Sequence, residues 1–136
     1  WLADNIKQLN YNFYLSDVPS ETLEFADWRL KRRKQNAKKF EIDPDTFPEY
    51  GDVKFDIIFM IDALEHMDKP YAAIEHLIKY CKPNETVLIE TWIDHEEKGV
   101  TNDLDREKEE TTELLRKNFV LVRPGVLKTW RKLSIF

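Results

Sequence analysis

Glycine is scarce in this chain: the 136 residues include only Gly51, Gly99 and Gly125. None of them lies in a Gly-x-Gly-x-x-Gly loop, which would bring the backbone close to a phosphate group. The single cysteine, Cys81, excludes an intramolecular disulfide and is typical of a reducing compartment. No apolar run approaches the roughly 18 residues of a membrane span, and no signal peptide is visible. The sequence therefore predicts a soluble, cytoplasmic protein without a membrane partner.

The sequence also has no excess of positively charged residues. The formal net charge is -5, whereas a surface that binds nucleic acid needs clustered Lys and Arg. The one basic cluster, residues 29–39, follows an amphipathic segment. It is interpreted as the solvated end of a helix, where cations are favourable, in preference to an RNA contact. We therefore expect no nucleic-acid partner.

The length and composition predict one domain. With 42% hydrophobic and 35% charged residues, a chain of 136 residues can bury a single core. The chain has no initiator methionine and opens at Trp1, with Leu2, Ile6 and Leu9 at helical spacing. The expectation is a single domain over residues 1–136 that is incomplete at its N-terminus.

Residues 55–70, FDIIFMIDALEHMDKP, form the segment around which the rest is organised. The apolar run 57–61 is too short for a helix and rich in β-favouring side chains, which predicts a strand buried on both faces. Such strands belong to parallel sheets covered by helices. Ligands bind beyond the carboxyl ends of these strands, and four polar residues follow this one: Asp62, Glu65, His66 and Asp68.

Patterning predicts the other elements. Strands are expected at residues 11–16, 38–43 and 86–91, and helices at 20–34, 69–80 and 106–117. Asn84 lies in the break after the helix predicted at residues 69–80, and Asn tolerates the left-handed conformation. Residues 96–106 are expected to form a loop or lid, and residues 119–136 an antiparallel hairpin around Pro124-Gly125.

The central segment resembles a known family. The resemblance is to class I S-adenosylmethionine-dependent methyltransferases, especially the small-molecule, ubiquinone-biosynthesis-like branch. The segment FDIIFMIDALEHMDKP is similar to the fourth strand of that family, the segment after it to the next helix, and CKPNETVLIETW to the fifth strand. The resemblance spans about residues 1–136 and is specific between about 17 and 92. It implies S-adenosylmethionine as cofactor and a Rossmann-like three-layer α/β sandwich, mostly parallel with a C-terminal antiparallel hairpin. The family's first strand and glycine loop have no counterpart in the chain.

Asp17 is the best candidate for binding the cofactor. An acid at the tip of a parallel strand can accept hydrogen bonds from both hydroxyls of a ribose. The alternative interpretation is a cap of the next helix, because the segment 17–20 also has good N-terminal chemistry. The resemblance favours the ribose and adds the neighbouring Val18.

Three more cofactor contacts follow from the resemblance. Asp43 is similar to the family residue that accepts a hydrogen bond from the adenine amine, although a solvated turn residue is the alternative interpretation. Ile61 and Asp62 occupy positions that face the adenine and methionine parts of the cofactor in the family.

His66 and His95 are the candidate catalytic bases, because imidazole titrates near neutral pH. Glu65 and His66 are adjacent and are not expected to form a pair, since neighbouring side chains seldom point the same way. Asp62, Glu65, His66 and His95 include the ligand types of a divalent metal. Their spacing is not a distinctive metal signature, so no metal site is predicted.

The resemblance and the candidate residues predict methyl transfer from S-adenosylmethionine to a small or medium-sized acceptor. The alternative is a non-catalytic, truncated module for binding or dimerisation, which the missing glycine loop favours. A nicotinamide or nucleotide-sugar enzyme on the same fold stays open as a third hypothesis. The expected partners are a small-molecule substrate and either a second copy of the chain or an N-terminal segment that supplies the missing strand.

Overall fold

The computed structural model describes residues 11–43, 46–91 and 102–134, so the helix predicted at residues 1–9 lies outside the described chain. The chain divides into two compact units, Trp1–Glu49 and Tyr50–Phe136. Each is described below by itself. The single domain and the third layer of the sandwich therefore stay predictions.

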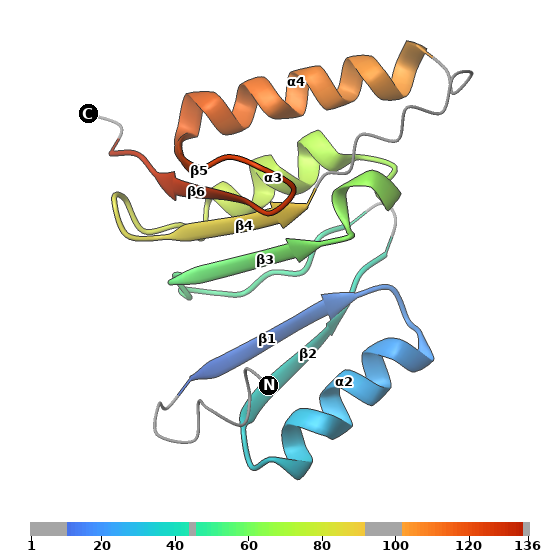
Figure 1. Ribbon diagram of the computed structural model, residues 1–136. Helices are drawn as coiled ribbons and strands as arrows, with labels where there is room; N and C mark the ends of the chain where they lie inside the picture. Colours follow the sequence, from blue (N-terminus) through green and yellow to red (C-terminus); the bar gives the residue numbers. More distant parts are fainter. Residues whose placement is uncertain (1–10, 44–45, 92–101, 135–136) are drawn as a thin grey trace. The chain divides into compact units, whose positions relative to one another are not determined.

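The first unit is a strand-helix-strand segment (Figure 1). Its elements are β1 (Asn12–Asp17), α2 (Glu21–Arg32) and β2 (Asn36–Glu41). The two strands pair in parallel, with Asn12 opposite Asn36 at one end and Asp17 opposite Glu41 at the other. Both strands and the helix were predicted, with β2 beginning two residues earlier than expected.

Local sequence explains why α2 begins where it does. The hydroxyl of Ser20 accepts a hydrogen bond from the amide of Leu23 at 3.2 Å, so Ser20 is the N-cap. Acidic residues occupy the first turn and basic residues the last, in agreement with the helix dipole. Leu23 and Asp27 are buried, and Asp27 is paired with Lys31 at 2.6 Å.

The second unit contains a four-stranded sheet and two helices (Figure 1). Its elements are β3 (Ile57–Ile61), a 3₁₀ turn (Leu64–His66), α3 (Pro70–Ile78), β4 (Val87–Thr91), α4 (Asn102–Asn118), β5 (Phe119–Arg123) and β6 (Lys128–Lys132). The strand order is β3-β4-β6-β5. β3 is parallel to β4, whereas β6 is antiparallel to both β4 and β5. The predicted C-terminal hairpin is confirmed.

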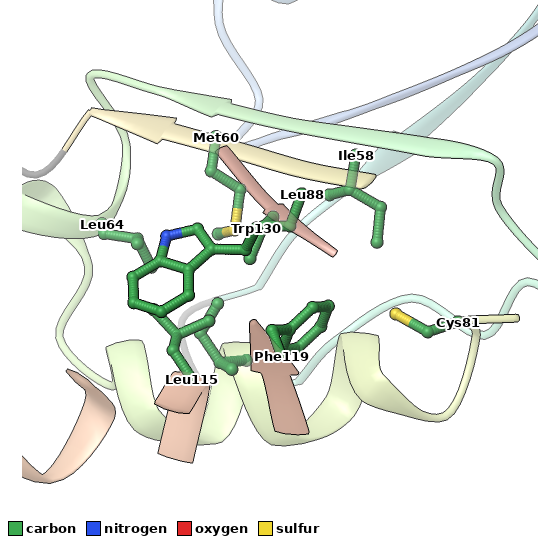
Figure 2. Close-up of a cluster of buried hydrophobic side chains, with 9 residues drawn as sticks. Ile58, Met60, Leu64, Cys81, Leu88, Leu115, Phe119 and Trp130 are labelled. Carbon is green, nitrogen blue, oxygen red and sulfur yellow. The ribbon is translucent and has the colours of Figure 1, made fainter. Parts of the chain in front are cut away.

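A single core cluster lies between this sheet and its helices (Figure 2). The cluster consists of Ile58, Met60, Leu64, Ile74, Cys81, Leu88, Leu115, Phe119 and Trp130. Its strand residues share one face, and its other members include Ile74 from α3 and Leu115 from α4. Both helices therefore cover the same face of the sheet.

The expectation that β3 is buried on both faces is wrong. Ile58 and Met60 are buried, but Ile57, Phe59 and Ile61 are 46%, 56% and 49% exposed. The cause is the placement of α3 and α4, which cover only the face that carries Ile58 and Met60. A continuous apolar run does not reveal how many of its faces are covered.

Two further expectations need correction. The described sheets are not mostly parallel, because β6 pairs antiparallel with two neighbours and makes the larger sheet mixed. α4 begins at Asn102 instead of residue 106, and its residues Thr111 and Leu115 are buried. Asn102 and the acids that follow it are good helix-start chemistry, so polarity alone was a poor indicator of a loop.

The turn before β4 has the predicted conformation. Asn84 has φ of 61°, in the left-handed region. Its side-chain amide donates to the hydroxyl of Ser134 at 2.6 Å and accepts from the amide of Ser134 at 3.0 Å. In the described parts of the chain, no helix combines the length and the apolar character that crossing a membrane requires.

Candidate functional site

Asp17 is the last residue of β1, and its side chain is exposed. One carboxylate oxygen accepts a hydrogen bond from the amide of Val18 at 2.8 Å, and the backbone carbonyl accepts from Ile42, also at 2.8 Å. α2 is capped by Ser20. The interpretation of Asp17 as the helix cap is therefore wrong, and its carboxylate stays available to a ligand.

Two further predicted residues lie close by in this unit. Val18 is 49% exposed directly after Asp17. Asp43 is exposed beyond the end of β2, and its carbonyl accepts from the amide of Thr46 at 3.0 Å, so its backbone belongs to a turn. Since β1 and β2 are parallel, Asp17 and Asp43 lie at the same, carboxyl-terminal edge of their sheet.

In the second unit, the chain leaves β3 by a sharp change of direction at Asp62. This residue has φ of 52°, a left-handed conformation that Asp tolerates better than most residues. Its amide donates to the hydroxyl of Thr91 at 2.8 Å, which attaches the turn to the end of β4. Ile61, just before it, is 49% exposed.

The structure pairs His66 with Asp62. Their Nε2 and Oδ1 atoms are 3.7 Å apart, and the two side chains are about 70% exposed. The 3₁₀ turn Leu64–His66 brings the imidazole back over the end of β3. The carboxylate partner of His66 is thus four residues away and was missed by sequence reasoning, although this spacing is the usual one for side-chain pairs on a helical turn.

Glu65 lies beside this pair. One ligand atom from each of Asp62, Glu65 and His66 lies within 4.8 Å of the others. Both carboxylate oxygens of Glu65 are buried and make no hydrogen bond within the described parts of the chain. Carboxylate oxygens and imidazole nitrogen are suitable ligands for a divalent cation. The expectation of no metal stays a prediction.

The side chain of Glu90 is buried and contacts other residues of the second unit. At 1% exposure it points from β4 toward the core face, where it accepts from the indole nitrogen of Trp130 at 3.1 Å and lies 3.6 Å from Lys128 Nζ. The pKa of Lys108 is lowered mainly by burial and also by the positive charge of Lys128. The negative charges of Glu90 and Glu65 act in the opposite direction. This burial excludes Glu90 from the exposed surface and from contact with a substrate there.

Two residues are excluded from a chemical role by their surroundings. Burial raises the pKa of the Cys81 thiol to about 11, so it is protonated at neutral pH and is not a nucleophile. His76 is buried beside the rings of Tyr50 and Tyr80. His95, the second candidate base, lies outside the described residues.

The chain is similar to methyltransferases. A family model described as "Methyltransferase domain" matches residues 1–120. An O-methyltransferase family protein from Burkholderia thailandensis is 14% identical, with a TM-score of 0.64 over 98% of this chain and 47% of that chain. A SAM-dependent methyltransferase from Aquifex aeolicus is 18% identical, with a TM-score of 0.65 over 98% of this chain and 74% of the other.

The N-methyltransferase NodS from Bradyrhizobium japonicum, in complex with S-adenosyl-L-homocysteine, is 17% identical with a TM-score of 0.65. The alignment covers 90% of this chain and 67% of NodS. No curated protein matches. At these identities the solved structures establish the fold alone, and this chain spans about half the length of the Burkholderia protein.

Proposed function

Since the chain belongs to the methyltransferase domain family, with S-adenosylmethionine as its cofactor, we propose that it serves methyl transfer to a small or medium-sized acceptor. The family match over residues 1–120 is the observation that carries this proposal. The acceptor class follows from the resemblance of residues 55–92 to the small-molecule, ubiquinone-biosynthesis-like branch. A cytoplasmic location and the absence of a nucleic-acid partner belong to the same proposal.

The exposed acids of the first unit suit a nucleoside. In the described contacts, the amide of Val18 donates to one carboxylate oxygen of Asp17. The other oxygen of Asp17 can therefore accept hydrogen bonds from ribose hydroxyls. The apolar surface of Val18 lies next to it. Asp43, at the same edge of the sheet, is proposed to accept from the adenine amine.

The second unit supplies the proposed base. When bound, S-adenosylmethionine provides an electrophilic methyl group on a sulfonium, so the protein must position the acceptor and remove its proton. His66 is proposed to take that proton, with the carboxylate of Asp62 at 3.7 Å orienting the imidazole. Ile61 and Asp62 are also proposed to contact the cofactor. His95 stays the alternative base.

Calorimetric titration with S-adenosylhomocysteine tests the cofactor assignment. Asp17→Asn keeps the acceptor for Val18 but removes the charge that strengthens the bonds to a ribose, so the affinity is expected to fall about tenfold. Glu21→Gln, an exposed acid at the start of α2, is the matched control and should bind like the unchanged chain.

Equal affinities for Asp17→Asn and Glu21→Gln would remove Asp17 from the site. No binding by the unchanged chain would leave the fold in place and favour the alternative, a non-catalytic module.

A further inference from the structure

The outer side of α2 carries two exposed aromatic residues. Phe25 and Trp28 are 57% and 50% exposed, and with Arg32 they share one face of the helix. α2 lies alongside β1 and β2 (Figure 1), and its buried residues Leu23 and Asp27 are on the side that packs against them. The step from Leu23 to Phe25 turns about 200° around the helix axis. Both aromatic rings therefore face away from the sheet of their own unit.

These side chains form a continuous row along the helix. The rings of Phe25 and Trp28 are stacked, with centroids 5.6 Å apart and an interplanar angle of 29°. The guanidinium of Arg32 lies over the Trp28 ring, 5.2 Å from its centroid. The indole thus has an aromatic ring about one turn before it and a cation one turn after it. We call Phe25, Trp28, Arg29 and Arg32 together the α2 ridge.

Positive charge is concentrated around the α2 ridge. Residues 28–39 contain no acid, although the whole chain has a formal net charge of -5. The basic residues of this range are Arg29, Lys31, Arg32, Arg33, Lys34, Lys38 and Lys39. Lys31 and Lys39 are paired with acids of α2, whereas Arg29 and Arg32 are exposed in its last turn. The surface beside the aromatic rings is therefore cationic and complementary to an anionic partner.

The geometry of the ridge argues against nucleic acid as that partner. Single strands bind through bases that stack on open aromatic faces, but Trp28 is already in contact with Phe25 and Arg32. A recognition helix enters the groove of a duplex with its N-terminal residues. The first turn of α2 carries Glu21 and Glu24, whose charges repel phosphates.

An anionic membrane surface suits the same features. Trp and Phe are favourable at the level of the lipid headgroups, and clustered Lys and Arg are attracted to anionic lipids. Arginine can lay its methylene groups along apolar surface while its guanidinium stays at the phosphates. The ridge is convex, because it lies on the outer side of a helix. A fluid lipid surface adapts to a convex face, whereas a protein partner has to supply a matching groove.

We propose that the α2 ridge binds the surface of a membrane that contains anionic lipids. The rings of Phe25 and Trp28 lie at the headgroup level, and Arg29 and Arg32 contact the lipid phosphates. The sequence-based expectation of no membrane partner rested on the lack of a spanning segment, which a surface contact does not need. This binding site goes beyond the methyl-transfer proposal and does not depend on it.

Sedimentation with lipid vesicles tests the site. The 136-residue chain is added to vesicles of phosphatidylcholine alone and to vesicles of equal parts phosphatidylcholine and phosphatidylglycerol. Binding to the anionic vesicles is expected to be at least about tenfold tighter, because several cations lie near the lipid surface. It should weaken as the salt concentration rises, since salt screens these charges.

Two matched double variants locate the contact. Arg29→Gln with Arg32→Gln removes two cations from the last turn of α2. Each is worth about fivefold near an anionic surface, so binding should weaken about thirtyfold. Arg116→Gln with Lys117→Gln removes two exposed cations from the last turn of α4 and should leave binding unchanged. Circular dichroism verifies that both variants are folded.

Fluorescence shows whether the aromatic rings reach the lipid. Phosphatidylcholine with brominated acyl chains quenches an indole that contacts them, so the emission of Trp28 should fall when brominated anionic vesicles are added. Trp28→Phe keeps an aromatic ring and should still bind, but it should lose this quenching. Trp130 is 3% exposed in the core and should not contribute.

Several results would overturn the proposal. Equal affinity for the two kinds of vesicle, or equal affinity of the two double variants, would remove the α2 ridge from the contact. Quenching that persists in Trp28→Phe would place another surface against the lipid. Binding to poly(U) or to polyglutamate without binding to vesicles would identify nucleic acid or an acidic protein segment as the partner. None of these results depends on whether S-adenosylhomocysteine binds.

Discussion

His66 is the side chain on which the proposed chemistry depends most. Its imidazole lies 3.7 Å from Asp62 and is well exposed, so it can reach an acceptor. His66→Gln is expected to lower the single-turnover rate of methyl transfer about a hundredfold or more, the usual contribution of a general base. The rate is measured with a panel of phenols and amines as acceptors.

The affinity for S-adenosylhomocysteine should be unaffected by His66→Gln, which separates proton removal from cofactor binding. Asp68→Asn, at an exposed acid two residues further on, is the control. A rate equal to that of the control would transfer the role of base to another residue, with His95 the next to test.

The thiol of Cys81 gives a prediction that depends on pH. Burial raises its pKa from 9.0 to about 11, so alkylation by iodoacetamide should have a midpoint near pH 11 in the folded chain and near 9.0 in denaturant. Because the folded pKa is the higher one, the protonated thiol contributes its full stability below pH 9 and loses it as the pH approaches 11. The same midpoint in both states would show that the thiol is accessible.

The candidate residues differ in how far sequence could predict them. The position of Asp17 at the end of β1 was predictable because it needs only the boundary of the strand, whereas its role in binding stays a prediction. The pairing of Asp62 with His66 was not predictable, since it depends on the left-handed backbone at Asp62, and that conformation is unusual outside glycine. The burial of Glu90 was missed for a related reason: which face its strand buries depends on α3 and α4.

Among the elements, α2 offers a direct test of its predicted start. Ser20→Ala removes the oxygen that accepts from the amide of Leu23 and should destabilise the helix by about 1 kcal/mol, whereas Ser20→Gly should cost only a few tenths. Urea unfolding followed by far-UV circular dichroism measures the difference. Equal stabilities of Ser20→Ala and the unchanged chain would mean that another group caps the helix.

Elements with strong local signals were predicted closely. Pro70 at the first position of α3, the caps of α2 and the turn around Gly125 all act within a few residues. The errors concern the burial of β3, which depends on helices distant in sequence, and the start of α4. An apolar pentamer has the same pattern whether one or both of its faces are covered, and the polar sequence at the start of α4 is compatible with a loop as well as with a helix.

For the whole chain, the family and the fold class were predictable because the resemblance rests on contiguous segments. The division into two units was not, since it reflects how contacts are distributed in space. Every member of the core cluster belongs to the second unit. In the described part of the first unit, Leu23 is the one buried hydrophobic residue.

This unequal burial predicts unequal local stability. Fully burying one large apolar side chain is worth about 1.5–3 kcal/mol, so the amide of Leu88 in β4 should exchange at least about a hundredfold more slowly than that of Leu15 in β1. Native-state hydrogen exchange at low denaturant measures both. Equal rates would show that the two units open together.

The order of strands in the larger sheet also has a consequence for synthesis. β6 is made after both β4 and β5, yet it lies between them in the sheet and contributes Trp130 to the core. On the ribosome, β4 can therefore pair with β6 only after residues 128–132 have emerged. A nascent chain that stalls before that point presents an unfinished apolar layer, the kind of surface that chaperones bind.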